Sequence, residues 1–279
     1  MNDINIYLAH YNSTDLMMMQ VNLIRKFFRY DITKSTLNIF GFVDSPNSQM
    51  AESMRSMWLS LNVTPINLPP NRDPYISKSY GLAFQYIYDN YIKKDTYISI
   101  FMENDIFPVT YINIEKYVEG YKMCGEIRFD GSFLPKDRMI MQWAGLQFFN
   151  HQLMTEKELY SGLCTDVTSL SGSVYSIDTG GSSYYWLMHN ENYRQCRHIP
   201  TIGCSPGYSP YSSSRCEVHN ITSDIEYLPE IMREKYDPGF RVINYDNIFI
   251  HLEEMRISNP RTAMKRTWLE YCYEKLMSI

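Results

Sequence analysis

Two carboxylates, Glu103 and Asp105, follow directly on an apolar run at residues 96–102. The run TYISIFM predicts a buried strand, and Pro108 shortly after the acids indicates a turn. Side chains at the carboxyl end of such a strand emerge at the edge where α/β sheets bind ligands. Two carboxylates at this edge suit Mg²⁺ or Mn²⁺, because these hard cations prefer oxygen ligands and bridge phosphates. A solvated turn is the alternative for this acid pair taken alone.

Strand-like and helix-like patterns alternate through the first hundred residues. Nearly continuous apolar runs predict strands buried on both faces, and apolar residues at helical spacing predict helices between them. This alternation predicts βαβ units and an α/β fold with a mostly parallel sheet flanked by helices. We expect strands at residues 5–9, 36–43, 63–68 and 96–102, and helices at residues 15–29, 49–61 and 77–92.

The pattern becomes irregular after Asp105. We expect a closing helix that Pro260 begins, since proline is favoured in the first turn of a helix. No internal repeat or low-complexity linker divides the chain, so we expect one domain over residues 1–279, regular over 1–105 and irregular over 106–279. The expected elements of the second half are an apolar segment at 138–150, a turn and helix at 176–189, a loop at 204–216, a strand at 242–252 and a helix at 260–277.

The composition is that of a globular protein with a core. Of the 279 residues, 44% are hydrophobic and 20% charged, and the formal net charge of −5 disfavours a broad nucleic-acid interface. The sequence shows no signal peptide and no run near the roughly 20 apolar residues of a membrane span. The six cysteines lack paired metal-ligand spacing. We therefore expect a soluble cytoplasmic protein without a membrane span, whose cysteines are free thiols.

The position of the acid pair resembles a known family. In GT-A glycosyltransferases a metal-binding Asp-x-Asp motif follows the fourth strand of the nucleotide-binding half, and Glu103-Asn104-Asp105 stands in that place. The sequence resembles nucleotide-sugar glycosyltransferases of the GT-A fold, related to family 2, with no specific family assigned. The resemblance implies a single GT-A-like domain in which residues 1–105 bind the nucleotide sugar and residues 106–279 form the acceptor side.

The resemblance also implies a bound Mn²⁺ or Mg²⁺. Its ligands would be Glu103, Asp105 and His251, since many GT-A enzymes bring a third metal ligand from a late histidine such as this one, at the end of an apolar run. The family pattern has Asp where this chain has Glu103, which makes Asp105 the stronger ligand.

The donor-binding residues implied by the resemblance lie mostly at the ends of the early strands. Residues 8–12 resemble the place where such enzymes cradle the nucleoside, and Asp44 stands where an acid meets the base or ribose. A turn or cap role is the alternative for Asp44, and helix capping is the alternative for the start of the third helix. The implied set is Ala9, His10, Tyr11, Asn12, Asp44, Ser79 and Asn104.

Residues 143–150 resemble the acceptor-side strand of GT-A enzymes, with Trp143 and Asn150 as the expected acceptor contacts. An aromatic ring stacks on a sugar face. Asp178 precedes Thr179-Gly180-Gly181, and in inverting GT-A enzymes an acid from this region removes the proton of the acceptor hydroxyl. A helix cap is the alternative for Asp178.

The implied function is transfer of a hexosyl or pentosyl group from a nucleotide-diphosphate sugar to a hydroxyl of a glycan, protein, small molecule or modified base. A first alternative is a catalytically inactive GT-A-like glycan-binding protein, because Glu103 departs from the Asp of the motif. A second is a sugar nucleotidyltransferase, which residues 10–14 disfavour because they contain no glycine after the first strand. A GxGxxG fingerprint and a Gly-x-Ser-x-Gly elbow are missing, which disfavours dinucleotide oxidoreductases and serine hydrolases.

Overall fold

The computed structural model describes residues 1–69, 76–130, 139–168, 174–177, 179–205, 225–253, 255 and 260–279. The chain forms two compact units. The first unit comprises Met1–Thr14, Tyr30–Glu103 and Glu115–His198, and the second comprises Asp15–Arg29, Asn104–Ile114 and Ile199–Ile279. The expectation of one domain over the whole chain stays a prediction.

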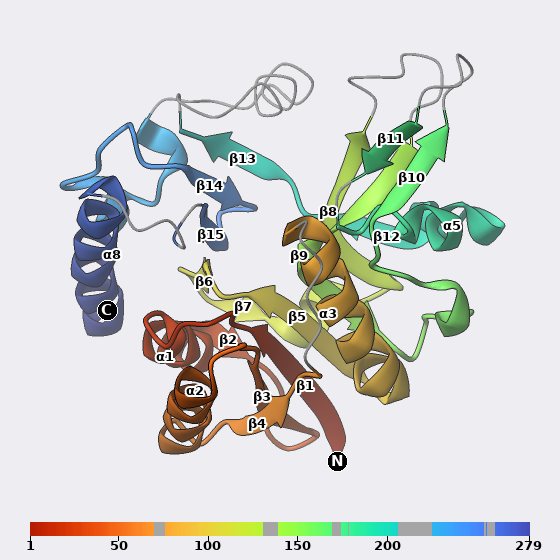
Figure 1. Cartoon of the computed structure of the whole chain (residues 1–279), viewed down its shortest axis with the longest axis horizontal. Helices are drawn as coiled ribbons and strands as arrows, with labels where there is room; N and C mark the ends of the chain where they lie inside the picture. The colour runs from red at the N-terminus through yellow and green to blue at the C-terminus, as the bar shows by residue number, and fades with distance from the viewer. Residues whose placement is uncertain are drawn as a thin grey trace. The chain divides into compact units, whose positions relative to one another are not determined.

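The first unit contains a seven-stranded sheet (Figure 1). Its strands lie in the order β12 (Cys196–His198), β8 (Met123–Asp130), β9 (Met139–Asn150), β5 (Ile98–Glu103), β1 (Asn2–Ala9), β3 (Ser35–Val43) and β4 (Thr64–Asn67). Four strands are mutually parallel, in the order β5, β1, β3 and β4. Strand β12 is parallel to β8, and β9 runs antiparallel to both β8 and β5. The predicted α/β class and mostly parallel sheet are confirmed.

Helix α2 (Ser48–Ser60) begins at a polar cap and covers one face of this sheet. The side chain of Asn47 accepts hydrogen bonds from the backbone N–H groups of residues 49 and 50, which satisfies two free donors of the first turn. Trp58 is fully buried against Gly41, where an added Cβ would lie 2.2 Å from the indole ring. Glycine at this position of β3 therefore makes room for the tryptophan.

Helix α3 (Ile76–Asn90) covers the other face. Phe84 packs edge-to-face on Phe101 of β5, with ring centroids 4.6 Å apart, and belongs to a buried cluster that includes Phe42. Gly41 and Phe42 are successive residues of β3, so their side-chain positions point to opposite faces of the sheet. Helices α2 and α3 consequently lie on opposite faces, as the βαβ pattern predicts.

The other elements of this part of the chain are short. They are η1 (Ile92–Lys94), α4 (Ile114–Val118), η2 (Lys157–Leu159), the antiparallel pair β10 (Thr165–Thr168) and β11 (Val174–Ile177), α5 (Ser183–Met188) and η3 (His189–Gln195).

The second unit contains an antiparallel sheet in the order β13 (Thr201–Cys204), β14 (Val242–Tyr245), β15 (Phe249–Leu252) and β6 (Ile106–Pro108). The single strand predicted at 242–252 is wrong: β14 and β15 form a hairpin. Residues 246–248 connect them: Asp246 and Asn247 have φ of 56° and 55°, the left-handed region that a type I′ turn requires, and the backbone N–H of Ile248 donates a 3.0 Å hydrogen bond to the carbonyl of Tyr245. The other elements are α1 (Met17–Phe27), the parallel pair β2 (Phe28–Arg29) and β7 (Ile112–Asn113), η4 (Ile225–Tyr227), α7 (Glu230–Arg233) and α8 (Pro260–Ser278).

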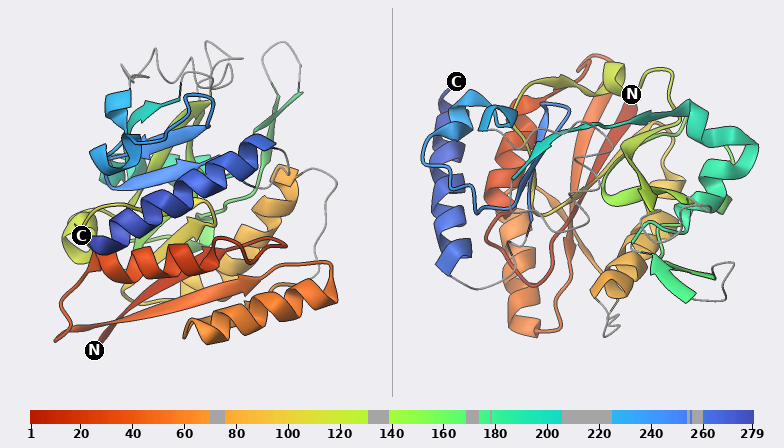
Figure 2. Two further views of the ribbon diagram at one scale, coloured as in Figure 1. Left: turned by 90° about the vertical axis from the view of Figure 1, so that its left-hand side faces the viewer. Right: turned by 90° about the horizontal axis from the view of Figure 1, so that it is seen from above.

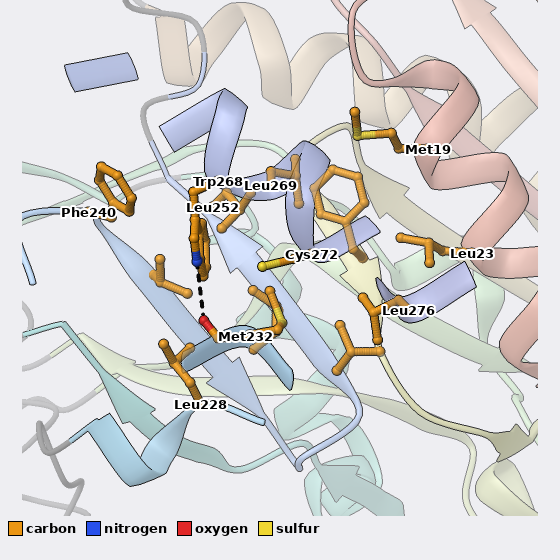
Figure 3. Close-up of a cluster of buried hydrophobic side chains, with 14 of the residues drawn as sticks. Met19, Leu23, Leu228, Met232, Phe240, Leu252, Trp268, Leu269, Cys272 and Leu276 are labelled. Atoms are coloured by element: carbon orange, nitrogen blue, oxygen red, sulfur yellow. Dashed lines mark hydrogen bonds between the residues drawn. The ribbon is translucent and has the colours of Figure 1, made fainter. Parts of the chain in front are cut away.

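Helices α1 and α8 lie side by side and close the core of the second unit (Figure 2). Met19 and Leu23 of α1 and Trp268 and Leu276 of α8 belong to one buried cluster (Figure 3). The indole Nε1 of Trp268 donates a 3.2 Å hydrogen bond to the carbonyl of Met232, so the ring's polar atom is satisfied inside the core. No helix in the described part of the chain combines the length and the apolar character needed to cross a membrane.

A buried polar network joins β1, β5 and the residue after β9 at the amino-terminal edge of the seven-stranded sheet. The carboxylate of Asp95 accepts hydrogen bonds from Asn5 Nδ2 and the Tyr7 hydroxyl, both at 2.8 Å, and from the Ser99 hydroxyl. Ser99 Oγ also lies 2.8 Å from His151 Nε2. Burial, and secondarily the charge of Lys157, lower the pKa of His151 to about 3 from its ordinary value of 6.5.

The depressed pKa of His151 predicts a stability loss in mild acid. Below pH 6.5 the unfolded chain takes up a proton at this histidine and the folded chain does not, so stability falls as the pH drops from 6.5 towards 3. At pH 5 the loss should be about 2 kcal/mol. Urea unfolding at pH 7.5 and pH 5 measures this loss. In His151→Gln the free energy of unfolding should differ between the two pH values by about 2 kcal/mol less than in the unchanged protein.

The control is His189→Gln, which changes an exposed histidine of η3. It keeps the buried ring of His151 and should therefore keep the loss of stability at pH 5. Equal pH dependence of the unchanged protein and His151→Gln would contradict the prediction.

Candidate active site

Asp105 and His251 face each other in the second unit. Strands β6 and β15 pair with His251 opposite Ile106, and the backbone N–H of Leu252 donates a 2.9 Å hydrogen bond to the carbonyl of Asp105. This pairing places His251 Nε2 3.5 Å from Asp105 Oδ1, with exposed fractions of 4% for the histidine and 8% for the aspartate. The two strands are apolar on either side of these groups, so the ladder and the core together fix the pair.

Neighbouring side chains hold this pair in place. The ring of His251 stacks on Tyr245, with centroids 6.2 Å apart and planes at 18°. The carboxamide of Gln20, fully buried on α1, donates a 2.9 Å hydrogen bond to the carbonyl of Ile106. Gln20 was not among the predicted site residues. The available signal was a polar residue among the apolar positions Met17, Val21 and Ile24 on the buried face of the helix.

Glu103 completes a group that has the composition of a metal site. It ends β5 two residues before Asp105, so the chain itself brings it to the same turn. Glu103, Asp105 and His251 each offer one ligand atom, and these atoms lie within 4.8 Å of one another. Two carboxylates and an imidazole are ligands that Mn²⁺ accepts, and the carboxylates alone suit Mg²⁺. The residues present fit a divalent cation.

Asn104 lies between the two acids and is itself buried. Its Oδ1 atom has no hydrogen-bond partner among the described residues. A buried acceptor left unpaired costs about 1–3 kcal/mol, so such an atom in a native protein needs an explanation. A ligand that donates a hydrogen bond at this turn would supply one.

The ends of β1 and β3 meet in the first unit. Tyr11 and Asp44 form a parallel bridge, and the backbone N–H of Asn12 donates a 2.8 Å hydrogen bond to the carbonyl of Asp44. Ser45 Oγ donates to Asn12 Oδ1 at 2.7 Å. Asn12 adopts a φ of 49°, a left-handed conformation that asparagine tolerates. These contacts bring Tyr11, Asn12 and Asp44 together at the carboxyl edge of the sheet.

The residues before them are less accessible. Ala9 is the last residue of β1 and is half-buried. The ring of His10 is buried and lies edge-on to Trp58, with centroids 5.0 Å apart. His10 therefore packs in the core beneath this edge.

Ser79 lies in the first turn of α3, and its neighbour Tyr80 connects this helix with β9. The hydroxyl of Tyr80 donates a 3.4 Å hydrogen bond to the carbonyl of Ala144. The beginning of α3 is thus near the middle of β9, next to the segment that contains Trp143.

The two predicted acceptor contacts lie far apart on β9. Trp143 is largely buried, and its ring covers Gly145, where an added Cβ would lie 2.1 Å from it. Asn150 pairs with Ile98, the first residue of β5, and its side chain bonds to the backbone of Val118 and Gln152. The structure therefore places Asn150 at the opposite end of β5 from Glu103 and does not bring it to the carboxyl edge.

Asp178 lies outside the described residues, as do residues 206–216 of the predicted loop. The residues that follow Asp178 are placed: Thr179 is buried, and Gly180 has a φ of 94°. A side chain at Gly180 would lie 2.1 Å from the carbonyl oxygen of Gln142, so this turn packs closely on β9.

Neither a protein-family model nor a curated protein matches the sequence. Solved structures of nucleotide-sugar glycosyltransferases are similar to it. One is the mannosyltransferase PcManGT from Pyrobaculum calidifontis, in complex with GDP-Man and Mn²⁺, with 13% identity, a TM-score of 0.43, and coverage of 80% of this chain and 62% of that one. Another is mouse xyloside xylosyltransferase 1, with 10% identity, a TM-score of 0.40, and coverage of 71% and 84%.

The galactosyltransferase LgtC, in complex with donor and acceptor sugar analogues, has 8% identity, a TM-score of 0.41 and coverage of 81% of both chains. This chain thus spans less than two thirds of the length of the mannosyltransferase and about four fifths of the other two. At these scores the similarities establish neither an activity nor a substrate for this chain.

The group of Glu103, Asp105 and His251 predicts a divalent-cation site that can be measured without any substrate. Asp105→Asn and His251→Gln should each weaken Mn²⁺ binding at least ~10-fold, because each removes a ligand atom. Isothermal titration calorimetry measures the affinity, and the rise in Tm with added Mn²⁺ gives a second readout.

Asp246→Asn is the control, since it changes an acid in the turn that precedes β15 and asparagine tolerates the same positive φ. Its Mn²⁺ affinity should equal that of the unchanged protein. Mn²⁺ binding that survives both ligand substitutions would place the cation elsewhere.

Proposed function

We propose that this chain is a glycosyltransferase that uses Mn²⁺ or Mg²⁺ to move a hexosyl or pentosyl group from a nucleotide-diphosphate sugar to an acceptor hydroxyl. The observation that carries the proposal is the group of Glu103, Asp105 and His251 at the end of the buried strand β5. Carboxylates at the carboxyl edge of an α/β sheet suit a cation that binds the phosphates of a nucleotide ligand.

In this proposal Asp105 and His251 hold the cation, with Glu103 as a further ligand. A divalent cation at this place would neutralise the negative charge that develops on the departing diphosphate. The buried amide oxygen of Asn104 accepts a hydrogen bond from the donor at the same turn. The burial of Asp105 and His251 strengthens their interaction with a charged ligand, because little water screens it.

The nucleoside of the donor would bind at the ends of β1 and β3. Tyr11, Asn12 and Asp44 meet there, so the aromatic ring, the amide and the carboxylate offer a base or ribose both stacking and hydrogen bonds. Ala9 and the first turn of α3 with Ser79 border this site in the proposal, and His10 supports it from the core through its contact with Trp58.

Asp178 is the proposed general base, and Trp143 the proposed acceptor contact. Asn150 is not carried forward, because its hydrogen bonds hold it at the other end of β5. A glycan, protein, small molecule or modified base serves as acceptor. We place the reaction in the cytoplasm, where a reducing environment suits the free thiols of Cys124, Cys196 and Cys272.

A panel of UDP-, GDP-, CMP- and dTDP-sugars tests the function. Donor hydrolysis and thermal stabilisation are measured with and without Mn²⁺ or Mg²⁺, for the unchanged protein and for Asp105→Asn. We expect one nucleotide class to raise the Tm in the presence of metal, donor hydrolysis with that class, and loss of both in the variant. A protein that binds a glycan without metal and consumes no donor would instead be a glycan-binding relative, and the transferase proposal would be wrong.

The donor site at β1 and β3 predicts a second result. Asp44→Asn removes a carboxylate that hydrogen bonds the nucleoside, and should weaken binding of the preferred nucleoside diphosphate by roughly 10–100-fold in the presence of Mn²⁺. Calorimetry measures the dissociation constant. Asp3→Asn, an exposed acid at the start of β1, is the matched control and should bind as the unchanged protein does. Equal affinity for both variants would exclude Asp44 from the site.

A further inference from the structure

The carboxamide of Gln142 on β9 is buried and has no hydrogen-bond partner in the part of the chain that the structure describes. Its exposed fraction is 0%, and neither Nε2 nor Oε1 has a partner among the described residues. An amide offers two donors and two acceptor sites, and leaving them unmet inside a protein costs more than any single lost hydrogen bond contributes. A buried amide with unmet hydrogen bonds lowers the stability of the fold, and such a residue is expected where it is used in binding.

The position of Gln142 is next to an irregularity of the sheet. Gln147 of β9 pairs with Gly125 of β8, and Gln142 pairs with Ile127, so four residues of β9 lie opposite the single residue Glu126. Such a bulge redirects the side chains around it and is common next to active sites. The bulge also borders the end of β5, since Leu146 pairs with Met102, the residue before Glu103.

The direction of β9 places Gln142 beyond the carboxyl end of β5, where Glu103 lies. Strand β9 is antiparallel to β5, so the residues before Leu146 continue beyond the carboxyl end of β5. At about 3.3 Å per residue, Gln142 lies at most ~13 Å along the strand from Leu146. A sugar attached to a diphosphate at Glu103 would extend over the same range.

Close contacts fix the backbone and the carboxamide of Gln142. Its backbone N–H donates a 2.7 Å hydrogen bond to Ser183 Oγ, and the turn at Gly180 packs on its carbonyl. A Cβ on Gly125 would lie 2.0 Å from its Nε2 atom, so the glycine leaves room for the amide. Strand β8, helix α5 and the turn at Gly180 thus surround the side chain of Gln142, and its amide forms no hydrogen bond with them.

Gln147, five residues further along β9, is a glutamine with a structural role and serves for comparison. It is also fully buried, but its Nε2 donates to the carbonyl of Trp143 at 2.9 Å and its Oε1 accepts from the Tyr160 hydroxyl at 2.9 Å. The contrast is between two buried amides in one strand, one with partners at both atoms and one with none.

We propose that Gln142 binds a hydroxyl group of a sugar, either on the group that is transferred or on the acceptor. The inference rests on the proposed function and assigns a positioning residue to it. Because an amide both donates and accepts, it matches a hydroxyl group, which does the same. The side chain is covered in this structure, so the sugar meets it after a change of rotamer, and no hydrogen bond of the amide has to break for that change.

The test replaces the amide side chain of Gln142, and in a control that of Gln147, by the thioether side chain of methionine, which has a similar length. In Gln142→Met the unmet polar atoms disappear, so the Tm should stay equal or rise, while KM for the bound sugar should increase about tenfold. An increase in the donor KM during hydrolysis identifies the transferred sugar, and an increase confined to the acceptor KM identifies the acceptor. In the control Gln147→Met the Tm should fall and both KM values should stay unchanged.

Loss of folded protein lowers kcat in proportion and leaves KM alone, so KM separates binding from a structural role. Unchanged KM values for donor and acceptor in Gln142→Met would overturn the inference, whatever the Tm does. A fall in Tm equal to that of Gln147→Met, with KM unchanged, would assign Gln142 to the core. Failure of the unchanged protein to bind or hydrolyse any nucleotide sugar would refute the proposed function itself, before any variant is made.

Discussion

The hydrogen bond from Leu252 N–H to the carbonyl of Asp105 fixes where the chain that leaves β5 meets the β14–β15 hairpin. A one-residue slip in this pairing would turn His251 to the other face of the sheet, since side chains alternate along a strand. The register is set on one side by the turn at residues 246–248 and on the other by Gln20, which donates a hydrogen bond to the carbonyl of Ile106. The buried cluster between α1 and α8 then stabilises the whole arrangement through apolar burial.

Buried polar side chains differ in how far their hydrogen-bonding capacity is met. Gln20, Gln147 and the half-buried Asp95 have partners that join separate segments of the chain, and they stabilise the fold by doing so. Asn104 Oδ1 and the amide of Gln142 have none among the described residues. Both of the latter lie at or beyond the carboxyl end of β5, one in the turn of the metal group and one beside the bulge of β9. Unmet hydrogen-bonding capacity in a protein interior is expected at functional sites, where local stability is given up for binding.

Local sequence patterns predicted the regular half of the fold because each element there is specified by neighbouring residues. The helix at 49–61 and the strand at 36–43 agree with α2 and β3 to within one residue. The hairpin at 242–252 was missed because the prediction joined the apolar residues on either side of Asp246 and Asn247 into one strand, although Asp and Asn are typical turn residues and both adopt a positive φ here. The bulge of β9 was missed for a related reason, since a bulge depends on pairing with a distant strand and leaves no periodic signal.

The candidate site was predictable to different degrees. Position at the end of an apolar strand was enough to propose Glu103 and Asp105. His251 was proposed from the resemblance to GT-A enzymes, and its strand β15 belongs to the four-stranded sheet, not to the sheet that contains β5. Asn150 was misplaced by the same kind of argument: in an antiparallel strand the last residue lies at the opposite edge, and the sequence alone does not give the direction of β9. Gln142 has no sequence signal beyond a polar residue in an apolar run, and its lack of partners is a property of packing.

The chemistry of the three ligand atoms bears on which cation the proposed site would take. Carboxylate oxygens serve Mg²⁺ and Mn²⁺ alike, whereas an imidazole nitrogen is a softer ligand that Mg²⁺ seldom accepts. His251 is held in place by Tyr245 and by the β6–β15 ladder, so it does not turn away to leave an all-oxygen site. A fixed nitrogen beside two carboxylates favours Mn²⁺ over Mg²⁺, and a site of this composition keeps that preference as long as the ladder holds the histidine against Asp105.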